Sequence, residues 1–119
     1  MYYKLDENKN AVPCSPMEWG KCREEMFKCK TKHVAEKTIG DYWISTVWLG
    51  LDHQWGNGKP LLFETMISNK GEWEDYCDRY STWIEAEEGH KRAVEWVKNG
   101  CKEDDDVILL FARSLNLIF

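Results

Sequence analysis

The segment between residues 44 and 67 places the strongest constraint on the fold of this chain. It reads ISTVWLGLDHQWGNGKPLLFETMI, in which two apolar runs rich in β-branched and aromatic residues flank a glycine-rich stretch. Such runs are typical of β-strands, and the glycines between them indicate a loop. Because binding and catalytic residues concentrate on loops held by rigid strands, the loop over residues 50–59 is predicted to form a binding site.

Two helix-start motifs divide the rest of the chain. A capping box that begins at Ser15 predicts a helix over residues 16–29. A second capping box begins at Thr82 and predicts a helix that ends at Asn99. The apolar stripes expected to be buried are Trp19, Cys22, Met26 and Cys29 in the first helix, and Trp83, Ala86, His90, Ala93, Val94 and Val97 in the second.

The remaining apolar segments predict short strands. We expect them at residues 2–5, 11–13, 34–39, 42–49, 61–67 and 76–80. The polar stretch over residues 69–78 indicates a long connection. The strand over residues 42–49 carries aromatic side chains on both faces. Helices on one side and a partner or ligand on the other would explain this pattern, as would a single covering loop.

Together these elements predict an α+β fold with an antiparallel sheet of about five strands, packed on one face against two main helices. Residues 1–100 are expected to form a single α+β domain, and residues 101–119 a C-terminal extension. In that extension, acidic residues precede an apolar run, which favours a short third helix over an edge strand. Its apolar residues fall at helical spacing and are a possible interface for a homo-oligomer.

Charge and cysteine usage exclude several classes of function. Residues 1–60 carry nine Lys/Arg against eight Asp/Glu, whereas residues 61–119 carry seven against thirteen, and the net charge is -5. Because an acidic half repels phosphate backbones, non-specific nucleic-acid binding is not expected. The five cysteines are odd in number and form no CxxC motif, so we expect free thiols and no structural zinc.

The apolar segments also bear on the cellular compartment. The chain starts with the polar stretch MYYKLDENKN, which has no signal-peptide character. No apolar run approaches the ~20 residues that span a bilayer. We therefore expect a protein of the reducing cytoplasm that does not cross a membrane.

Four residues in or near the predicted loop have the chemistry of a binding site. Asp52 and His53 are adjacent, and an imidazole changes its charge near neutral pH. The same pair is common in turns, where the aspartate caps the backbone and the histidine is merely exposed. Trp48 and Trp55 offer stacking surfaces for a base or a sugar.

Two further candidates lie outside the loop. Glu64 interrupts an apolar strand, where it either faces the core and needs a partner or faces solvent. His90 falls on an apolar helical stripe, the usual position of a buried structural histidine. If His53 and His90 met Asp52 or Glu64 in the fold, they would form a metal or acid/base site. Their spacing is not diagnostic, so no catalytic residue, metal or cofactor is assigned.

Three segments of the chain resemble a family of small phage and prophage proteins of unknown function. They are STVWLGLDHQWGNGKPLLFETMI at residues 45–67, YSTWIEAEEGHKRAVEWV at residues 80–97 and YYKLDENKNAVPCSPMEW at residues 2–19. Members of that family typically carry STVFLGLDH, PLLFETM and YSTWEEAEAGH. The likeness covers residues 2–98, with Trp48 in place of the usual Phe. It implies a viral gene expressed in the cytoplasm of a bacterial host. Because that family has no established activity, the resemblance assigns no catalytic role to any residue.

We therefore favour a non-enzymatic, phage-derived binding protein that inhibits or sequesters a host component, either a defence-related protein or a small nucleotide signal. One alternative is a small hydrolase or nuclease-like enzyme that uses His53, His90 and a carboxylate. Another is a structural or assembly accessory protein whose apolar C-terminal segment is an oligomer interface.

Overall fold

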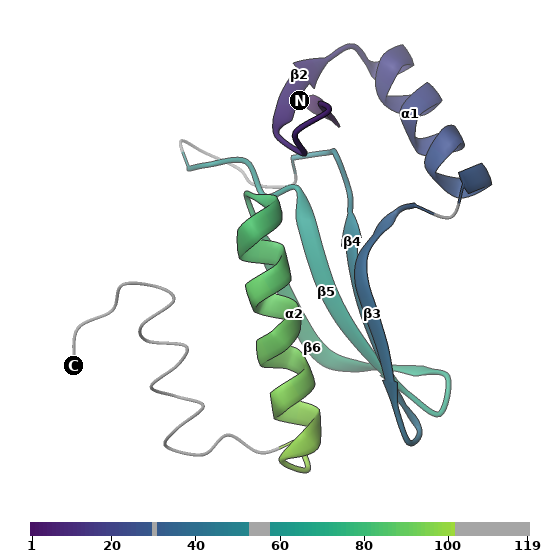
Figure 1. Ribbon diagram of the computed structural model, residues 1–119, viewed down its shortest axis with the longest axis vertical. Helices are drawn as coiled ribbons and strands as arrows, with labels where there is room; N and C mark the ends of the chain where they lie inside the picture. The colour runs from purple at the N-terminus through teal and green to yellow at the C-terminus, as the bar shows by residue number, and fades with distance from the viewer. Residues whose placement is uncertain (30, 53–57, 102–119) are drawn as a thin grey trace.

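The computed structural model describes residues 1–29, 31–52 and 58–101 and has an α+β fold (Figure 1). In chain order, its elements are β1 (Tyr2–Leu5), β2 (Ala11–Cys14), α1 (Pro16–Cys29), β3 (His33–Ile39), β4 (Tyr42–Trp48), β5 (Phe63–Asn69), β6 (Glu72–Tyr80) and α2 (Trp83–Lys98). The predicted fold class is confirmed, and α1 and α2 occupy the predicted ranges. The predicted helix of the C-terminal extension, from residue 102 onward, lies outside the described residues.

The strands form two antiparallel sheets, so the predicted single sheet of about five strands is wrong. β1 pairs with β2, whereas β3, β4, β5 and β6 form a four-stranded sheet in that order. The β1–β2 hairpin meets the end of β4, where the backbone N–H of Tyr3 donates to the carbonyl oxygen of Gly50 at 2.8 Å. Gly50 has a φ of 69°, and a Cβ atom there would lie 2.9 Å from the Tyr3 oxygen. Only glycine allows this close crossing, through which the hairpin caps the larger sheet instead of extending it.

The polar stretch over residues 69–78 is not the long connection that its composition predicts. Lys70 and Gly71 form a two-residue turn in which both φ angles are positive, at 53° and 84°, as a tight hairpin requires. β6 therefore pairs with β5 from Glu72 onward, with a bulge near its middle. The polar residues of β6 are compatible with a strand because it lies at the edge of the sheet.

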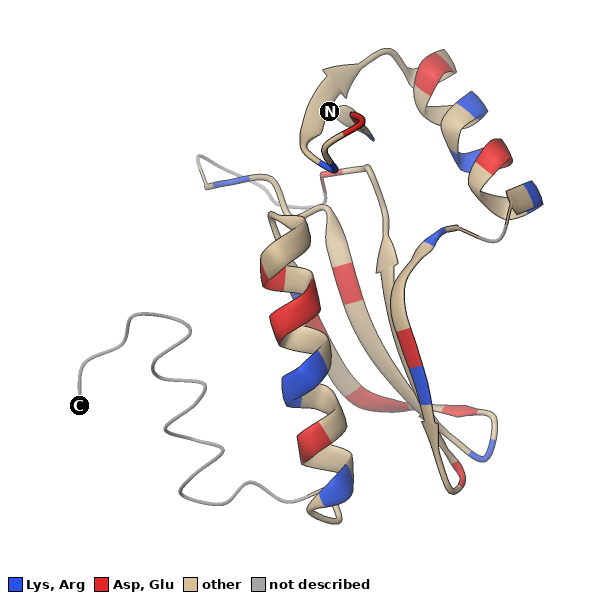
Figure 2. Ribbon diagram, in the orientation of Figure 1, with Lys and Arg blue, Asp and Glu red and all other residues tan. Residues whose placement is uncertain are grey.

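α2 lies across one face of the four-stranded sheet (Figure 1). Its buried residues recur at helical spacing and are mostly small, namely Ala86, Gly89, His90, Ala93 and Val97. They pack against apolar side chains of the sheet and its flanks, chiefly Ile44, Trp48, Leu62, Phe63, Ile67 and Tyr80. The other side of α2 carries residues of both charges (Figure 2). The small residues let the helix axis approach the sheet closely.

α1 does not lie on the sheet beside α2, which corrects that part of the predicted fold. It packs against β1, and none of its residues is fully buried. The indole Nε1 of Trp19 donates to the carbonyl oxygen of Leu49 at 3.0 Å, and Arg23 Nη1 donates to that of Trp48 at 2.6 Å. These two side-chain hydrogen bonds hold α1 at the end of β4. Cys29, which the sequence predicts to be buried, is exposed.

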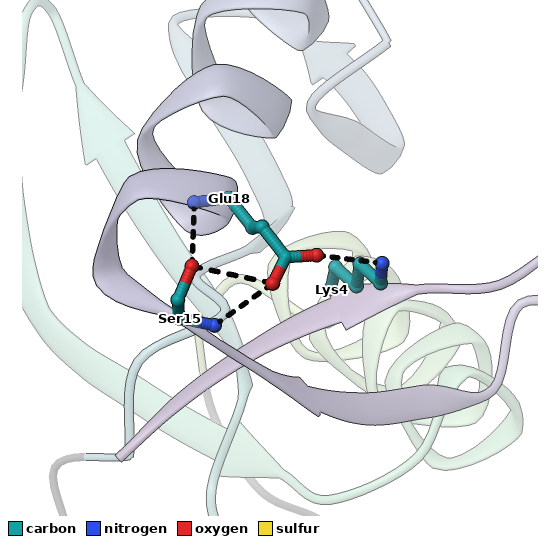
Figure 3. A network of polar contacts seen from close by, with 3 residues as sticks. All are labelled: Lys4, Ser15 and Glu18. Carbon is teal, nitrogen blue, oxygen red and sulfur yellow. Dashed lines mark hydrogen bonds and ion pairs between the residues drawn. The ribbon is translucent and has the colours of Figure 1, made fainter.

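The predicted caps form at both helix starts, with the full reciprocal capping box at Ser15. Ser15 Oγ accepts from the backbone N–H of Glu18 at 3.1 Å, and Glu18 Oε1 accepts from that of Ser15 at 3.3 Å (Figure 3). Lys4 of β1 adds an ion pair with Glu18 Oε2 at 2.9 Å, and this contact lowers the pKa of Glu18. At α2, Thr82 Oγ1 accepts from the backbone N–H of Glu85 at 3.1 Å. The first box therefore also joins α1 to the β1–β2 hairpin.

The structure also bears on membrane crossing and on the state of the cysteines. No helix among the described residues is long and apolar enough to cross a lipid bilayer. All five cysteines are free thiols, as predicted; three are partly buried and two, Cys29 and Cys77, are exposed.

Candidate functional site

The predicted binding loop is described only at its two ends. At its start, the backbone N–H of Asp52 donates to the carbonyl oxygen of Met1 at 3.1 Å. The Oδ1 atom of Asp52 accepts from the backbone N–H of Leu61 at 3.4 Å, across the base of the loop. Asp52 thus has the backbone-capping role that is common for aspartate in turns. His53 and Trp55 lie outside the described residues, so their part in a site stays a prediction.

Trp48 lies in the core rather than beside a ligand. It is 1% exposed, and its ring meets the Phe63 ring edge-on with the ring centroids 4.9 Å apart. Buried aromatic pairs of this geometry stabilise a core beyond the area that they remove from water. Trp48 therefore stabilises the core, and its buried indole offers no surface on which a ligand could stack.

His90 belongs to a buried polar cluster between α2 and the sheet. Its Nδ1 atom lies 2.8 Å from Thr46 Oγ1, which in turn lies 2.6 Å from Thr65 Oγ1. The hydroxyl of Tyr80 donates to Thr65 Oγ1 at 3.1 Å. If Thr65 donates to Thr46 and Thr46 to His90, every hydroxyl proton has an acceptor. That order requires a His90 Nδ1 atom without a proton.

Burial keeps both ends of this cluster neutral. Removal from water lowers the pKa of the His90 imidazole and raises the pKa of the Tyr80 hydroxyl. A neutral imidazole matches the acceptor role of its Nδ1 atom. His90 is therefore a structural residue of the helix–sheet interface, the role typical of a histidine on an apolar stripe.

Glu64 lies on the opposite face of the sheet from His90. Thr65 points toward α2 and contacts the cluster of His90, so its neighbour Glu64 points away from the helix. Glu64 Oε2 accepts from Arg79 Nε at 3.0 Å on the adjacent strand. The sheet therefore separates Glu64 from His90, and the structure does not bring these two together into an acid/base pair. Among the described residues, no group of three or more His, Cys, Asp or Glu side chains could hold a metal ion.

The face of the sheet that points away from α2 forms a distinct surface, which we call the open face. Strand pairing places its residues from β4, β5 and β6 in three rows: Trp43, Ser68 and Trp73; Ser45, Met66 and Cys77; Val47, Glu64 and Arg79. Of the two described helices, α2 packs on the other face of the sheet and α1 packs against β1. On this face Trp73 is exposed and Trp43, Val47 and Met66 are partly exposed, whereas the two serines are buried.

Two tryptophans dominate the open face. Trp43 and Trp73 flank Ser68, whose small side chain lets their ring centroids approach to 5.9 Å. Trp73 is 56% exposed. Beside the pair lies a shallow hollow of about 200 Å³, lined by His33, Trp43, Ser45, Glu64, Met66 and Trp73 among others. The hollow joins aromatic walls to the carboxylate of Glu64.

The sequence predicts a surface role for one of these two tryptophans, Trp43, but not for the other, Trp73. Aromatic side chains on both faces of the β4 segment predict a covering partner or ligand, and Trp43 lies on the face that α2 leaves uncovered. Trp73 is missed because its polar surroundings suggest a connection. The signal that finds it is the Lys70-Gly71 turn, since a two-residue hairpin there places Trp73 opposite Ser68.

No protein-family model matches the chain, and no curated protein and no solved structure matches it.

Proposed function

We propose that this chain is a non-enzymatic binding protein of phage origin that inhibits or sequesters a protein of its bacterial host through the open face. The observation that carries the proposal is the Trp43–Trp73 pair on a sheet face that α2 does not cover. Tryptophan is the residue type most enriched among those that dominate binding energy at protein interfaces. The phage origin rests on the resemblance of the sequence motifs.

The size of the hollow favours a protein over a small nucleotide at this face. Its volume is about 200 Å³, whereas sites for small molecules usually enclose about 300–1,000 Å³. A hollow of this size suits one side chain of a partner, with the rest of the partner spread over the surrounding surface. Met66 and the two indoles in its lining provide the apolar centre of such an interface.

The polar residues around the hollow have the arrangement of an interface rim. The Glu64–Arg79 ion pair, at 3.0 Å, borders the apolar centre on one side. His33 lies on the same side and forms an ion pair with Glu36 at 3.5 Å when its imidazole is charged. Because these charges already have partners within the chain, a protein that covers them leaves few of them unpaired.

The experiment is capture of host proteins from a bacterial lysate by the full-length chain and two variants. Trp73→Ala removes an indole from the open face, whereas Ile84→Ala removes another exposed apolar side chain from α2, on the other side of the sheet. We expect the wild-type chain and Ile84→Ala to retain the same host protein. Trp73→Ala should weaken that binding by at least about tenfold, as loss of a dominant interface residue does.

Two outcomes contradict the proposal. The first is a captured protein that binds wild type, Trp73→Ala and Ile84→Ala equally well. The second is purification of the chain with a bound nucleotide that Trp73→Ala abolishes, because the open face would then be a small-molecule site. Thermal denaturation of each variant shows that the comparison is made between folded proteins.

A further inference from the structure

A second cavity lies away from the open face, between the β1–β2 turn and the start of α2. Its volume is about 370 Å³, and its lining includes Asn8, Lys9, Asn10, Phe63, Ser81 and Trp83. That volume falls within the range of about 300–1,000 Å³ typical of small-molecule sites. Aromatic walls with a few polar groups are also the usual lining of such sites.

A hydrogen-bonded turn presents Lys9 to this cavity. The Oδ1 atom of Asp6 accepts from the backbone N–H groups of Asn8 and Asn10, each at 2.9 Å. Lys9 between them has a φ of 64°, a left-handed conformation that is uncommon for a residue with a side chain. Its Nζ atom lies 4.3 Å from the centroid of the Trp83 ring. The turn thus holds a positive charge at the aromatic wall of the cavity.

The aromatic wall is continuous with the core. Trp83 meets Phe63 at right angles, with an interplanar angle of 87° and centroids 6.1 Å apart. Ile84 next to Trp83 also lines the cavity and is 68% exposed. Trp83 and Ile84 give a planar apolar group a surface to pack against, while Phe63 is buried behind Trp83 and Lys9 is exposed to solvent.

Lys9 is the basic side chain in the lining of this cavity, and the start of α2 is capped by its own side chains. Thr82 Oγ1 already accepts from the backbone N–H of Glu85 at 3.1 Å, and Thr82 donates to Glu85 Oε1 at 2.9 Å. Glu87 is the acidic side chain in the lining. Because like charges repel, Glu87 disfavours a ligand with several negative charges spread across the cavity.

We propose that this cavity binds a small molecule that joins a planar ring to a single anionic group. The ring packs against Trp83 and Ile84, and the anionic group lies beside Lys9 Nζ. The amide side chains of Asn8 and Asn10 border the same space. A nucleoside monophosphate and an aromatic carboxylic acid share this chemistry, so both serve as probes. This site is separate from the open face and does not depend on the proposed protein partner.

Calorimetric titration of the full-length chain with matched pairs of compounds tests the proposal. The pairs are AMP with adenosine, and 4-hydroxyphenylacetate with 4-hydroxyphenylacetamide. In at least one pair, we expect the anionic compound to bind at least about tenfold more tightly than the neutral one, the size of a charge-assisted hydrogen bond. A preference in the AMP pair alone identifies a nucleotide, and one in the carboxylate pair alone identifies an aromatic acid.

A lysine variant and its control test whether the preference for the anionic compound arises in this cavity. Lys9→Ala should remove the difference between the members of a pair, whereas Lys37→Ala, which removes an exposed lysine of β3, should retain it. In the wild-type protein, the preference should also weaken as salt is raised, because salt screens an exposed charge. Equal binding of charged and neutral compounds, or a preference that survives Lys9→Ala, overturns the proposal. Trp73→Ala should leave these titrations unchanged, so the two proposed sites fail or stand independently.

Discussion

The two faces of the four-stranded sheet are built from alternate residues of the same strands and have opposite properties. On β5, Phe63, Thr65 and Ile67 point toward α2 and are buried, whereas Glu64 and Met66 point to the open face and are only partly buried. Ser68 also lies on the open face and is buried between Trp43 and Trp73 of the neighbouring strands. On the covered face, the hydroxyl groups of Thr46, Thr65 and Tyr80 form one chain of hydrogen bonds that ends at His90, and small residues of α2 pack above it. On the open face, by contrast, the Trp73 indole is exposed to solvent.

This difference separates what stabilises the molecule from what is available for binding. Removal of a buried group leaves a cavity or an unsatisfied partner, both of which cost free energy of unfolding. Removal of an exposed indole costs little stability, since the indole is largely solvated in the folded state. Substitutions on the covered face should therefore change stability, and substitutions on the open face should change binding.

The largest effect is expected where α2 approaches the sheet most closely. A methyl group on Gly89 would overlap the ring and hydroxyl of Tyr80. We expect Gly89→Ala to lower the free energy of unfolding by about 3 kcal/mol, because a packed interface must shift to make room. For a chain of this length, that loss corresponds to a decrease of about 10 °C in Tm, measured by thermal denaturation.

Gly20 in α1 provides the matched control. A methyl group there has no neighbour within 4 Å, and alanine is favoured over glycine in a helix interior by about 0.5–1 kcal/mol. Gly20→Ala should therefore raise Tm slightly. Equal and small effects of the two substitutions would show that α2 is not closely packed on the sheet.

A smaller loss is expected from Thr65→Val, which keeps the shape of the side chain and removes its hydroxyl. Tyr80 then loses its acceptor, and Thr46 loses a partner at 2.6 Å. Leaving such buried groups unsatisfied costs about 1–3 kcal/mol, which urea denaturation can measure. Thr38→Val on the exposed edge strand β3 should change stability by less than about 0.5 kcal/mol. A similar loss in both variants would contradict the difference between the faces.

The same cluster predicts how stability depends on pH. Burial lowers the pKa of His90 in the folded chain below its value of about 6.5 in the unfolded chain. The unfolded chain therefore binds more protons below about pH 6.5, so the stability that neutral His90 contributes is complete above that pH and is lost as pH falls through the folded-state pKa. Urea denaturation between pH 7.5 and pH 5 should show a steeper loss for wild type than for His90→Gln. Parallel curves would exclude His90 as the source.

Local signals predict the helices well because their information is contained in a few neighbouring residues. The capping boxes at Ser15 and Thr82 place both helix starts correctly, and Asn99 forms the C-cap of α2. The separation of the β1–β2 hairpin from the main sheet depends instead on contacts distant in sequence, such as that between Tyr3 and Gly50. No pattern within either segment specifies that contact.

The candidate site is harder to predict than the helices, because it depends on which face of each strand is covered. Strand alternation shows that Glu64 and Thr65 point in opposite directions, but only the placement of α2 shows which of them is buried. The position of His90 on an apolar stripe correctly indicates burial, although its threonine partners come from two distant strands. The surface position of Trp73 follows only from the register in which β6 pairs with β5.

The smallest effect on stability is expected from Trp73→Ala, which most sharply tests the contrast between the faces. Trp73 is 56% exposed and touches Trp43 at a centroid distance of 5.9 Å, so its removal costs part of one aromatic contact. We expect the free energy of unfolding to fall by less than about 1 kcal/mol, as measured in urea. The fluorescence of the folded protein should change, since a partly exposed indole is lost. A loss as large as that of Gly89→Ala would mean that the open face belongs to the folded core, and the reason to regard it as a binding surface would disappear.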